Sequence, residues 1–193
     1  DCAEGHVILT LAPLAPAITG HEFVVRVRSS AAVAPGQAFT GVQLAMYFDT
    51  DWLQLDRVEP VHAGFVQIAS QCNNVNGTIC YAAGFGGEGG TAFSSAADLV
   101  DLVFTLKQSP VCGHASLLGF KQVGPFRTAL STADGMGLEP IAVDLDNSDL
   151  DTLAPTITGV PESVGEIPVD IGVGNGSLVP APQNVAAYDL CSG

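Results

Sequence analysis

Residues 41–48, with the sequence GVQLAMYF, decide the fold. Large apolar side chains occupy every second position of this stretch, and the positions between them hold Gln43, Ala45 and Tyr47. An alternation with a period of two is typical of a β-strand that has one buried face and one wetter face. Residues 23–28 show the same alternation, so they predict a second strand of this kind.

Further apolar segments are separated by turns rich in Gly or Pro, and no long segment has the 3.6-residue period of an amphipathic helix. The sequence therefore predicts an all-β protein, a sandwich of nine short strands that occupies residues 1–150. Eight of these strands are given bounds, namely the two above and residues 6–11, 53–58, 77–83, 99–106, 116–123 and 138–143.

The composition excludes several classes of protein. Hydrophobic residues make up 47% of the 193 residues and charged residues only 13%, which excludes intrinsic disorder. The formal net charge of −14 opposes binding to nucleic acids and to anionic membrane surfaces. No apolar run is long enough to span a bilayer, so we expect no membrane span.

The first residues and the cysteine content predict an extracellular protein. The sequence begins with Asp1 and Cys2 rather than with Met, which we interpret as a mature N-terminus left after removal of a signal peptide. Five cysteines and two N-x-S/T sequons indicate an oxidising compartment. Asn76 and Asn175 are therefore candidate glycosylation sites on a secreted or cell-surface protein.

The cysteines predict one disulfide and leave a second one open. Cys72 and Cys80 enclose a short segment rich in Asn and Gly, and a hairpin of that length brings its ends within reach of a disulfide. Cys2, Cys112 and Cys191 form an odd set. They allow either one further bridge and a free thiol, or a bond to another chain.

The order of these features over residues 5–145 resembles a cohesin domain. The resemblance implies a nine-stranded jelly-roll sandwich of the kind known from cellulosome scaffolds and from other secreted bacterial and archaeal proteins. The motifs of this resemblance are apolar patterns, so the resemblance supports the fold more strongly than it supports a partner. The matching segments are 7–11, the turn at 35–36, 41–49, 52–55 (WLQL), 63–65 (AGF), 77–79 (GTI), 102–106 (LVFTL) and 141–143.

Residues 151–193 resemble a different family, the Ig-like hyalin (HYR) repeat of extracellular adhesive proteins. Residues 151–158 (DTLAPTIT) are similar to its first strand, and residues 188–193 (YDLCSG) to a later strand and turn. The usual cysteine after the first strand is replaced by Gly159-Val160-Pro161, so Cys191 lacks the partner that this family implies. The module is also incomplete, with too few strands to bury a core of its own.

An incomplete sheet has to pair with something, and this gives the main functional hypothesis. We expect the C-terminal β segment to add a strand to a neighbouring copy, so that the chain forms an extracellular filament or surface structure. Two other interpretations stay open: the segment folds back on its own domain, or the chain is part of a longer protein that completes the module. The residues expected at the assembly contact are Ile157, Val160, Val164, Ile167, Val169, Ile171 and Val173.

An acidic run joins the two regions. Asp144, Asp146, Asp149 and Asp151 offer hard oxygen ligands, which are the ligands that Ca²⁺ prefers. The run lacks the glycine and the final glutamate of an EF-hand loop. It therefore fits either a calcium site or a solvated acidic linker.

No catalytic motif is present, and we expect a protein without enzymatic activity. Asp49, Asp51 and Asp56 fall in strand-end turns and have no general-acid environment that the sequence reveals. Cys112 and His114 lie close in sequence, but no third group that would orient them can be named. The alternative to a homopolymer is a monomeric cohesin-like recognition module that binds a surface protein or a polysaccharide.

Overall fold

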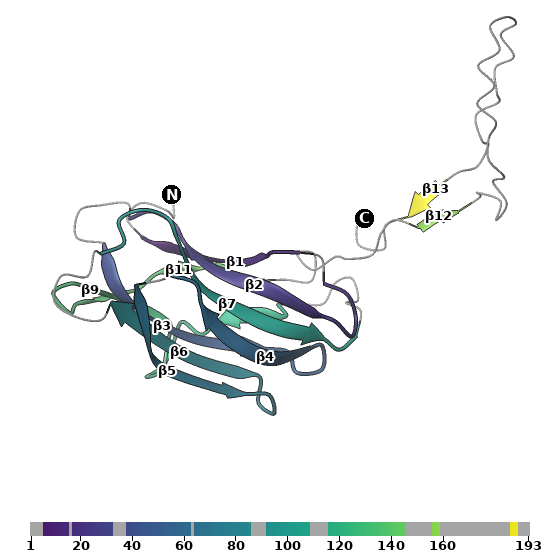
Figure 1. The fold of residues 1–193 in the computed structure, drawn as a ribbon, viewed down its shortest axis with the longest axis horizontal. Coiled ribbons are helices and arrows are strands. Elements are labelled where there is room, and N and C mark those ends of the chain that lie inside the picture. Colours follow the sequence, from purple (N-terminus) through teal and green to yellow (C-terminus); the bar gives the residue numbers. More distant parts are fainter. Residues whose placement is uncertain are drawn as a thin grey trace, which may run out of the picture. The chain divides into compact units, whose positions relative to one another are not determined.

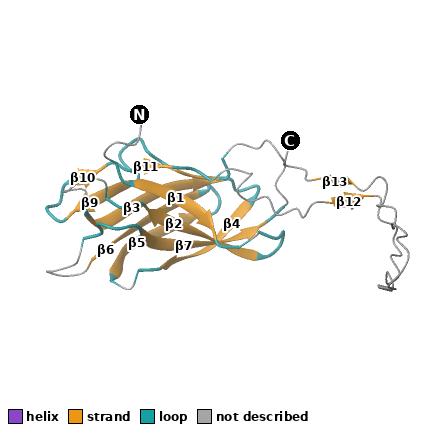
Figure 2. Ribbon diagram, turned by 90° about the horizontal axis from the view of Figure 1, so that it is seen from above, coloured by secondary structure: helices purple, strands orange, loops and turns teal. Residues whose placement is uncertain are grey.

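A computed structural model describes residues 6–15, 17–32, 38–62, 64–85, 92–108, 116–145, 156–158 and 186–188. The chain divides into two units, Asp1–Thr152 and Leu153–Gly193, which are treated separately below. Within the described residues every regular element is a β-strand, as Figure 2 shows for both units. A search of the same residues finds no helix that is long and apolar enough to cross a membrane.

The first unit is a sandwich of two sheets, which Figure 1 shows one above the other. Sheet A is five-stranded, in the order β11-β1-β2-β7-β4, and its strands pair antiparallel except for β1 and β11. Its strands are β1 (Ile8–Pro13), β2 (Glu22–Ser29), β4 (Leu53–Pro60), β7 (Ala97–Leu106) and β11 (Ile141–Ala142).

Sheet B is six-stranded, in the order β10-β9-β3-β6-β5, and β8 pairs with the far end of β3 beyond β9. All its pairings are antiparallel. Its strands are β3 (Phe39–Phe48), β5 (Phe65–Asn73), β6 (Thr78–Phe85), β8 (Leu118–Phe120), β9 (Ala129–Thr132) and β10 (Gly137–Leu138).

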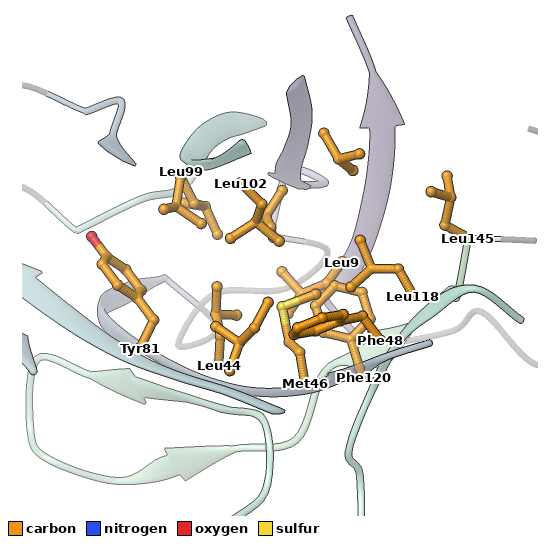
Figure 3. Close-up of a cluster of buried hydrophobic side chains, with 14 of the residues drawn as sticks. Leu9, Leu44, Met46, Phe48, Tyr81, Leu99, Leu102, Leu118, Phe120 and Leu145 are labelled. Atoms are coloured by element: carbon orange, nitrogen blue, oxygen red, sulfur yellow. The ribbon is translucent and has the colours of Figure 1, made fainter. Parts of the chain in front are cut away.

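The core lies between the sheets, where the apolar positions of the alternating strands meet. Sheet A contributes Leu9 and Leu102, and sheet B contributes Leu44 and Met46, all of them buried (Figure 3). Phe104 of β7 is fully buried and its ring lies 6.1 Å from that of Phe23 and 5.5 Å from that of Phe48, measured between centroids. The predicted all-β sandwich is confirmed.

Two predicted strands differ in their bounds. Residues 138–143 form two short strands in different sheets, because the chain passes from β10 in sheet B to β11 in sheet A at Pro140, which has no N–H to donate to a ladder. Residues 116–123 contribute only the three residues of β8. The strands β5 and β9 were not among the segments predicted.

In the second unit, β12 (Thr156–Thr158) and β13 (Ala186–Tyr188) form a two-stranded antiparallel sheet. Ile157, one of the residues expected at an intermolecular contact, is opposite Ala187 of the same chain. This ladder lies within the chain, and pairing of the segment with another copy stays a prediction.

The hydroxyl of Tyr81 is buried in the core without a hydrogen-bond partner among the described residues, and burial raises its pKa. A buried donor without a partner costs about 1–3 kcal/mol. We expect Tyr81→Phe to raise the free energy of unfolding by about 1 kcal/mol in urea denaturation. Tyr47→Phe is the matched control and should lower it, because the Tyr47 hydroxyl donates to Asp144. Equal changes for both variants would contradict this assignment.

Candidate functional site: the outer face of sheet B

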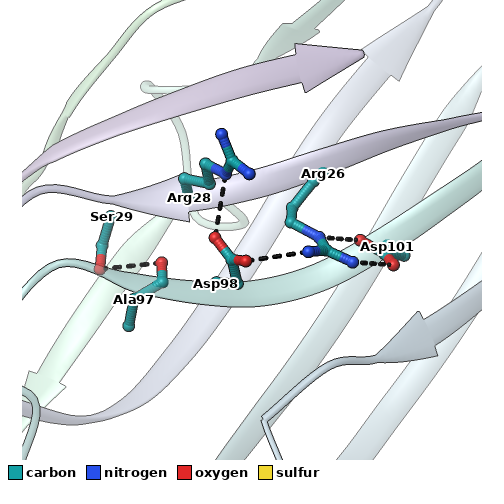
Figure 4. A network of polar contacts seen from close by, with 6 residues as sticks. All are labelled: Arg26, Arg28, Ser29, Ala97, Asp98 and Asp101. Atoms are coloured by element: carbon teal, nitrogen blue, oxygen red, sulfur yellow. Dashed lines mark hydrogen bonds and ion pairs between the residues drawn. The ribbon is translucent and has the colours of Figure 1, made fainter. Parts of the chain in front are cut away.

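The outer face of sheet A is covered by ion pairs, as Figure 4 shows for its centre. Arg26 donates from Nε and one terminal nitrogen to Asp101, at 2.7 and 2.8 Å, and from the other to Asp98 at 2.9 Å. Arg28 donates from Nε to the second oxygen of Asp98 at 2.9 Å. The hydrogen bonds to Asp101 raise the pKa of Arg26 further, so the guanidinium keeps its charge.

The same face continues onto β4 with a second group of charges. Arg57 donates to Glu22 at 2.8 Å and to Glu59 at 2.6 Å. These charged groups already have partners within the chain, and a protein that covered them would have to desolvate them. The outer face of sheet A is therefore poorly suited to an extensive protein interface.

The outer face of sheet B carries no charged residue at its outward positions on β3, β5, β6 and β9. Because Val42, Leu44, Met46 and Phe48 of β3 are buried, the alternate positions of β3 and their ladder partners point outward. We call this surface the neutral face. It consists of Gly41, Gln43, Ala45 and Tyr47 on β3, Thr78, Cys80, Ala82 and Gly84 on β6, Val66, Ala69, Gln71 and Asn73 on β5, and Ala129 and Ser131 on β9.

The neutral face is hollowed at its centre, because alanines and other short side chains stand there. A depression of about 260 Å³ lies over Ala45, Ala82 and Ala69, and Phe126 forms one of its walls. Phe126 is 70% exposed in a loop outside the strands. An exposed ring beside a floor of small side chains forms a recess that an apolar side chain of a partner can occupy.

A second depression continues the first toward β9 and β10. It has a volume of about 470 Å³, and Gly41, Gly84 and the side chain of Ile68 line it. Ile68 is 75% exposed at a bulge of β5. A Cβ added at Gly41 would lie 2.5 Å from Ser131 Oγ, so the Ser131 side chain would have to move to admit any side chain at this position.

One end of the neutral face is fixed by Tyr47. Its hydroxyl donates to Asp144 Oδ2 at 2.7 Å and lies 3.2 Å from Ser116 Oγ. The Ser116 contact lowers the pKa of Tyr47, but burial and the Asp144 carboxylate outweigh it and raise the pKa overall. A Cβ at Gly119 would lie 2.4 Å from the Tyr47 hydroxyl, so only glycine fits beside this ring.

Asp144, a predicted calcium ligand, has a structural role in the described part of the chain. Its Oδ1 accepts a hydrogen bond from the Phe120 backbone N–H at 2.8 Å, and its Oδ2 accepts from Tyr47. Asp146, Asp149 and Asp151 lie outside the described residues. Among the residues that are described, no group of three or more His, Cys, Asp or Glu side chains is placed to hold a metal ion.

The calcium site over residues 144–151 stays a prediction. If it binds Ca²⁺, adding millimolar Ca²⁺ to chelated protein should raise the melting temperature, because a bound cation stabilises the folded state and screens the crowded carboxylates. Differential scanning fluorimetry measures this shift, with Mg²⁺ as the control ion. An unchanged melting temperature would leave the solvated acidic linker as the interpretation.

The predicted Cys72–Cys80 bridge is not what the structure shows: both residues are exposed free thiols. Cys72 is opposite Ile79, and Cys80 is opposite Gln71. Opposed residues point to the same face and successive residues to opposite faces, so the two thiols lie on opposite faces of sheet B. A bridge between them would need a slip of the ladder by one residue, which the sequence spacing alone does not reveal.

The other predicted site residues are only partly within the described chain. Asn76 is exposed in the turn between β5 and β6, where Asn73 Oδ1 accepts hydrogen bonds from the backbone N–H groups of Val75 and Asn76. Glycosylation of Asn76 stays a prediction. The following residues lie outside the described residues: Cys2, Cys112, Cys191, Asn175, Val160, Val164, Ile167, Val169, Ile171 and Val173.

Sequence reasoning missed the neutral face, because it searched for charged, nucleophilic and metal-ligating residues. The available signal was the outward half of the alternating strands. On β3 and β6 these positions hold Gly, Ala, Gln, Thr, Cys and Tyr, but no Asp, Glu, Lys or Arg. A patch without charge that extends over neighbouring strands is a signal to examine for a contact surface.

No family model matches the chain, and no curated protein matches it either. Solved structures do match the fold. The cohesin module of a family 33 glycoside hydrolase from Clostridium perfringens is similar with a TM-score of 0.55 and 12% identity, over 71% of this chain and 91% of that chain.

Two further similar structures are cohesins determined in complex with dockerins. The third ScaC cohesin of Acetivibrio cellulolyticus, bound to the ScaB dockerin, has a TM-score of 0.54 and 11% identity over 72% of this chain and 94% of that chain. The OlpA cohesin of Clostridium thermocellum, also bound to a dockerin, has a TM-score of 0.52 and 12% identity over 72% and 95%. The first unit therefore has a cohesin-like β-sandwich fold, whereas the HYR resemblance of residues 151–193 has no match among these structures.

Proposed function

We propose that this chain is a recognition module that binds a dockerin-bearing protein through the neutral face of sheet B. The observation that carries the proposal is an uncharged, hollowed face on a cohesin-like sandwich whose opposite face is covered by ion pairs. The recognition module was the alternative interpretation of the sequence.

The energetic difference between the two faces supports the choice of sheet B. Covering the neutral face removes Ala69, Ala82 and a few amide or hydroxyl groups from water, whereas Ala45 is already buried. Phe126 and Ile68 add exposed apolar surface at the sides of this face. Burial of such surface is favourable by about 25 cal/mol per Å². Covering the outer face of sheet A would desolvate Arg26, Asp98 and Asp101 without offering them better partners.

The shape of the neutral face indicates what a partner presents. Its floor of alanines and glycines accepts protruding apolar side chains, and Gln43 and Gln71 beside them supply amide groups for hydrogen bonds. A helix that presents apolar side chains on one face suits such a surface. The partner residues at the centre of the contact are therefore expected to be apolar and uncharged.

Assembly into a filament has less support than the recognition module. Apart from Ile157, whose strand pairs within the chain, the residues expected at that contact lie outside the described residues. The similar structures are cohesin modules, several of them in complexes with dockerins. We accordingly place the recognition module first. We expect it to act outside the cell or at its surface, without catalytic activity of its own.

Isothermal titration calorimetry of the full chain against the dockerin modules of its source organism tests this proposal. We expect saturable one-to-one binding to at least one of them, with a negative heat-capacity change because apolar surface is buried. A soluble oligosaccharide panel serves as the comparison. Binding to an oligosaccharide but to no dockerin module would overturn the proposal and favour a polysaccharide ligand.

A further inference from the structure

Strand β5 is a long sheet edge that lacks the charge and the proline by which many sandwiches protect their edges. It ends the order of sheet B and pairs only with β6, so its outer main-chain groups have no ladder partner among the described residues. Its sequence, FVQIASQCN, contains no charged residue and no proline, and all of its residues after Phe65 are exposed. Such an edge is a template for pairing with another strand.

The other edges of the sandwich differ from β5. Strand β4, the edge of sheet A that precedes β5 in the chain, carries Asp56, Arg57 and Glu59 and ends at Pro60. The remaining edges, β8, β10 and β11, are two or three residues long. Charge, proline, shortness and bulges are the usual protections against edge pairing, and of these β5 has only a bulge, between Gln67 and Ala69.

We propose that β5 pairs antiparallel with β5 of a second copy of this chain, so that the two B sheets become one continuous sheet. Pairing across a two-fold axis satisfies the same main-chain groups in both copies through one self-complementary contact. Each chain has a net charge of −14, so association is opposed wherever acidic surfaces meet. A strand without charge is the place where two copies approach with the least repulsion.

The bulge between Gln67 and Ala69 limits where this pairing occurs. A bulge bends a strand and interrupts its ladder, so the regular part available to a partner is Ala69–Asn73. Ser70 lies within this stretch, opposite Tyr81, and therefore points away from the neutral face. The neutral faces of both copies stay open to their partners in this arrangement.

Sedimentation velocity of the full chain from micromolar to millimolar concentration tests the pairing. We expect a concentration-dependent dimer, and we expect Ser70→Lys to weaken it at least about tenfold, because it places two like charges on the same face of the paired strands, close to the two-fold axis. Ser95→Lys is the control with the same charge change at an exposed position outside the strands, and it should leave the dimer unchanged. A chain that is monomeric throughout, or a dimer that Ser70→Lys leaves intact, would overturn the proposal.

Hydrogen exchange of the unsubstituted chain gives a second measurement that needs no variant. The amides of Ala69–Asn73 should exchange more slowly at high than at low protein concentration, and exchange independent of concentration would overturn the pairing. The dimer test and the test of the recognition proposal can fail independently. Ser70→Lys should still bind a dockerin module, whereas failure of all dockerin modules to bind would leave the dimer unaffected.

Discussion

Phe104→Ala lowers the free energy of unfolding by about 3–5 kcal/mol, the range for deleting a buried phenylalanine ring. The ring is fully buried between the sheets and contacts the rings of Phe23 and Phe48. Native domains are stable by only about 5–15 kcal/mol, so the variant is expected to lose a large part of its stability. Urea denaturation followed by circular dichroism measures the change.

Phe126→Ala is the matched control, because it removes the same ring from a position that is 70% exposed. Its free energy of unfolding should change by no more than about 0.5 kcal/mol. A comparable loss in both variants would mean that the sandwich core is not where the structure places it.

Ala82→Arg weakens binding of the dockerin partner by at least about 100-fold, because it places an unpaired charge at the centre of an apolar contact. Ala82 faces outward on β6, opposite Gln43 on one side and Ala69 on the other, and lines the central depression. The long side chain also fills the space that a partner residue would enter. Titration calorimetry measures the loss, and circular dichroism checks that the fold is kept.

Ala31→Arg makes the same substitution at an exposed position outside the strands. Its dissociation constant should stay within about threefold of the unsubstituted chain, since surface changes away from a contact have small effects. If Ala82→Arg binds as tightly as Ala31→Arg, the partner contacts another surface.

The fold was predictable wherever a strand faces the core. In β2 the buried positions alternate with exposed or half-buried ones, and in β3 every second residue from Val42 to Phe48 is a large buried apolar one, so hydrophobic periodicity located both strands. Strand β5 buries only Phe65, and its remaining residues carry no period that reveals a strand. An edge strand that covers little of the core is held by main-chain hydrogen bonds, which leave little trace in the sequence.

The candidate site was less predictable than the fold, because it depends on register. Ala45, Ala82 and Ala69 are far apart in the sequence and unremarkable there, and only the ladders of β3, β6 and β5 bring them together. The same holds for the cysteines. Their spacing suggested a bridge, whereas the register of β5 and β6 places their thiols on opposite faces.

Hydrogen exchange of the chain with and without its bound dockerin partner tests the central claim most directly. Recognition through the neutral face predicts slower exchange in β3, β6 and β5, together with the loop around Phe126, and unchanged exchange in β2, β7 and β4. Protection of β2 and β7, with β3 and β6 unchanged, would contradict the claim, because it would place the partner on the ion-paired face of Arg26 and Asp101.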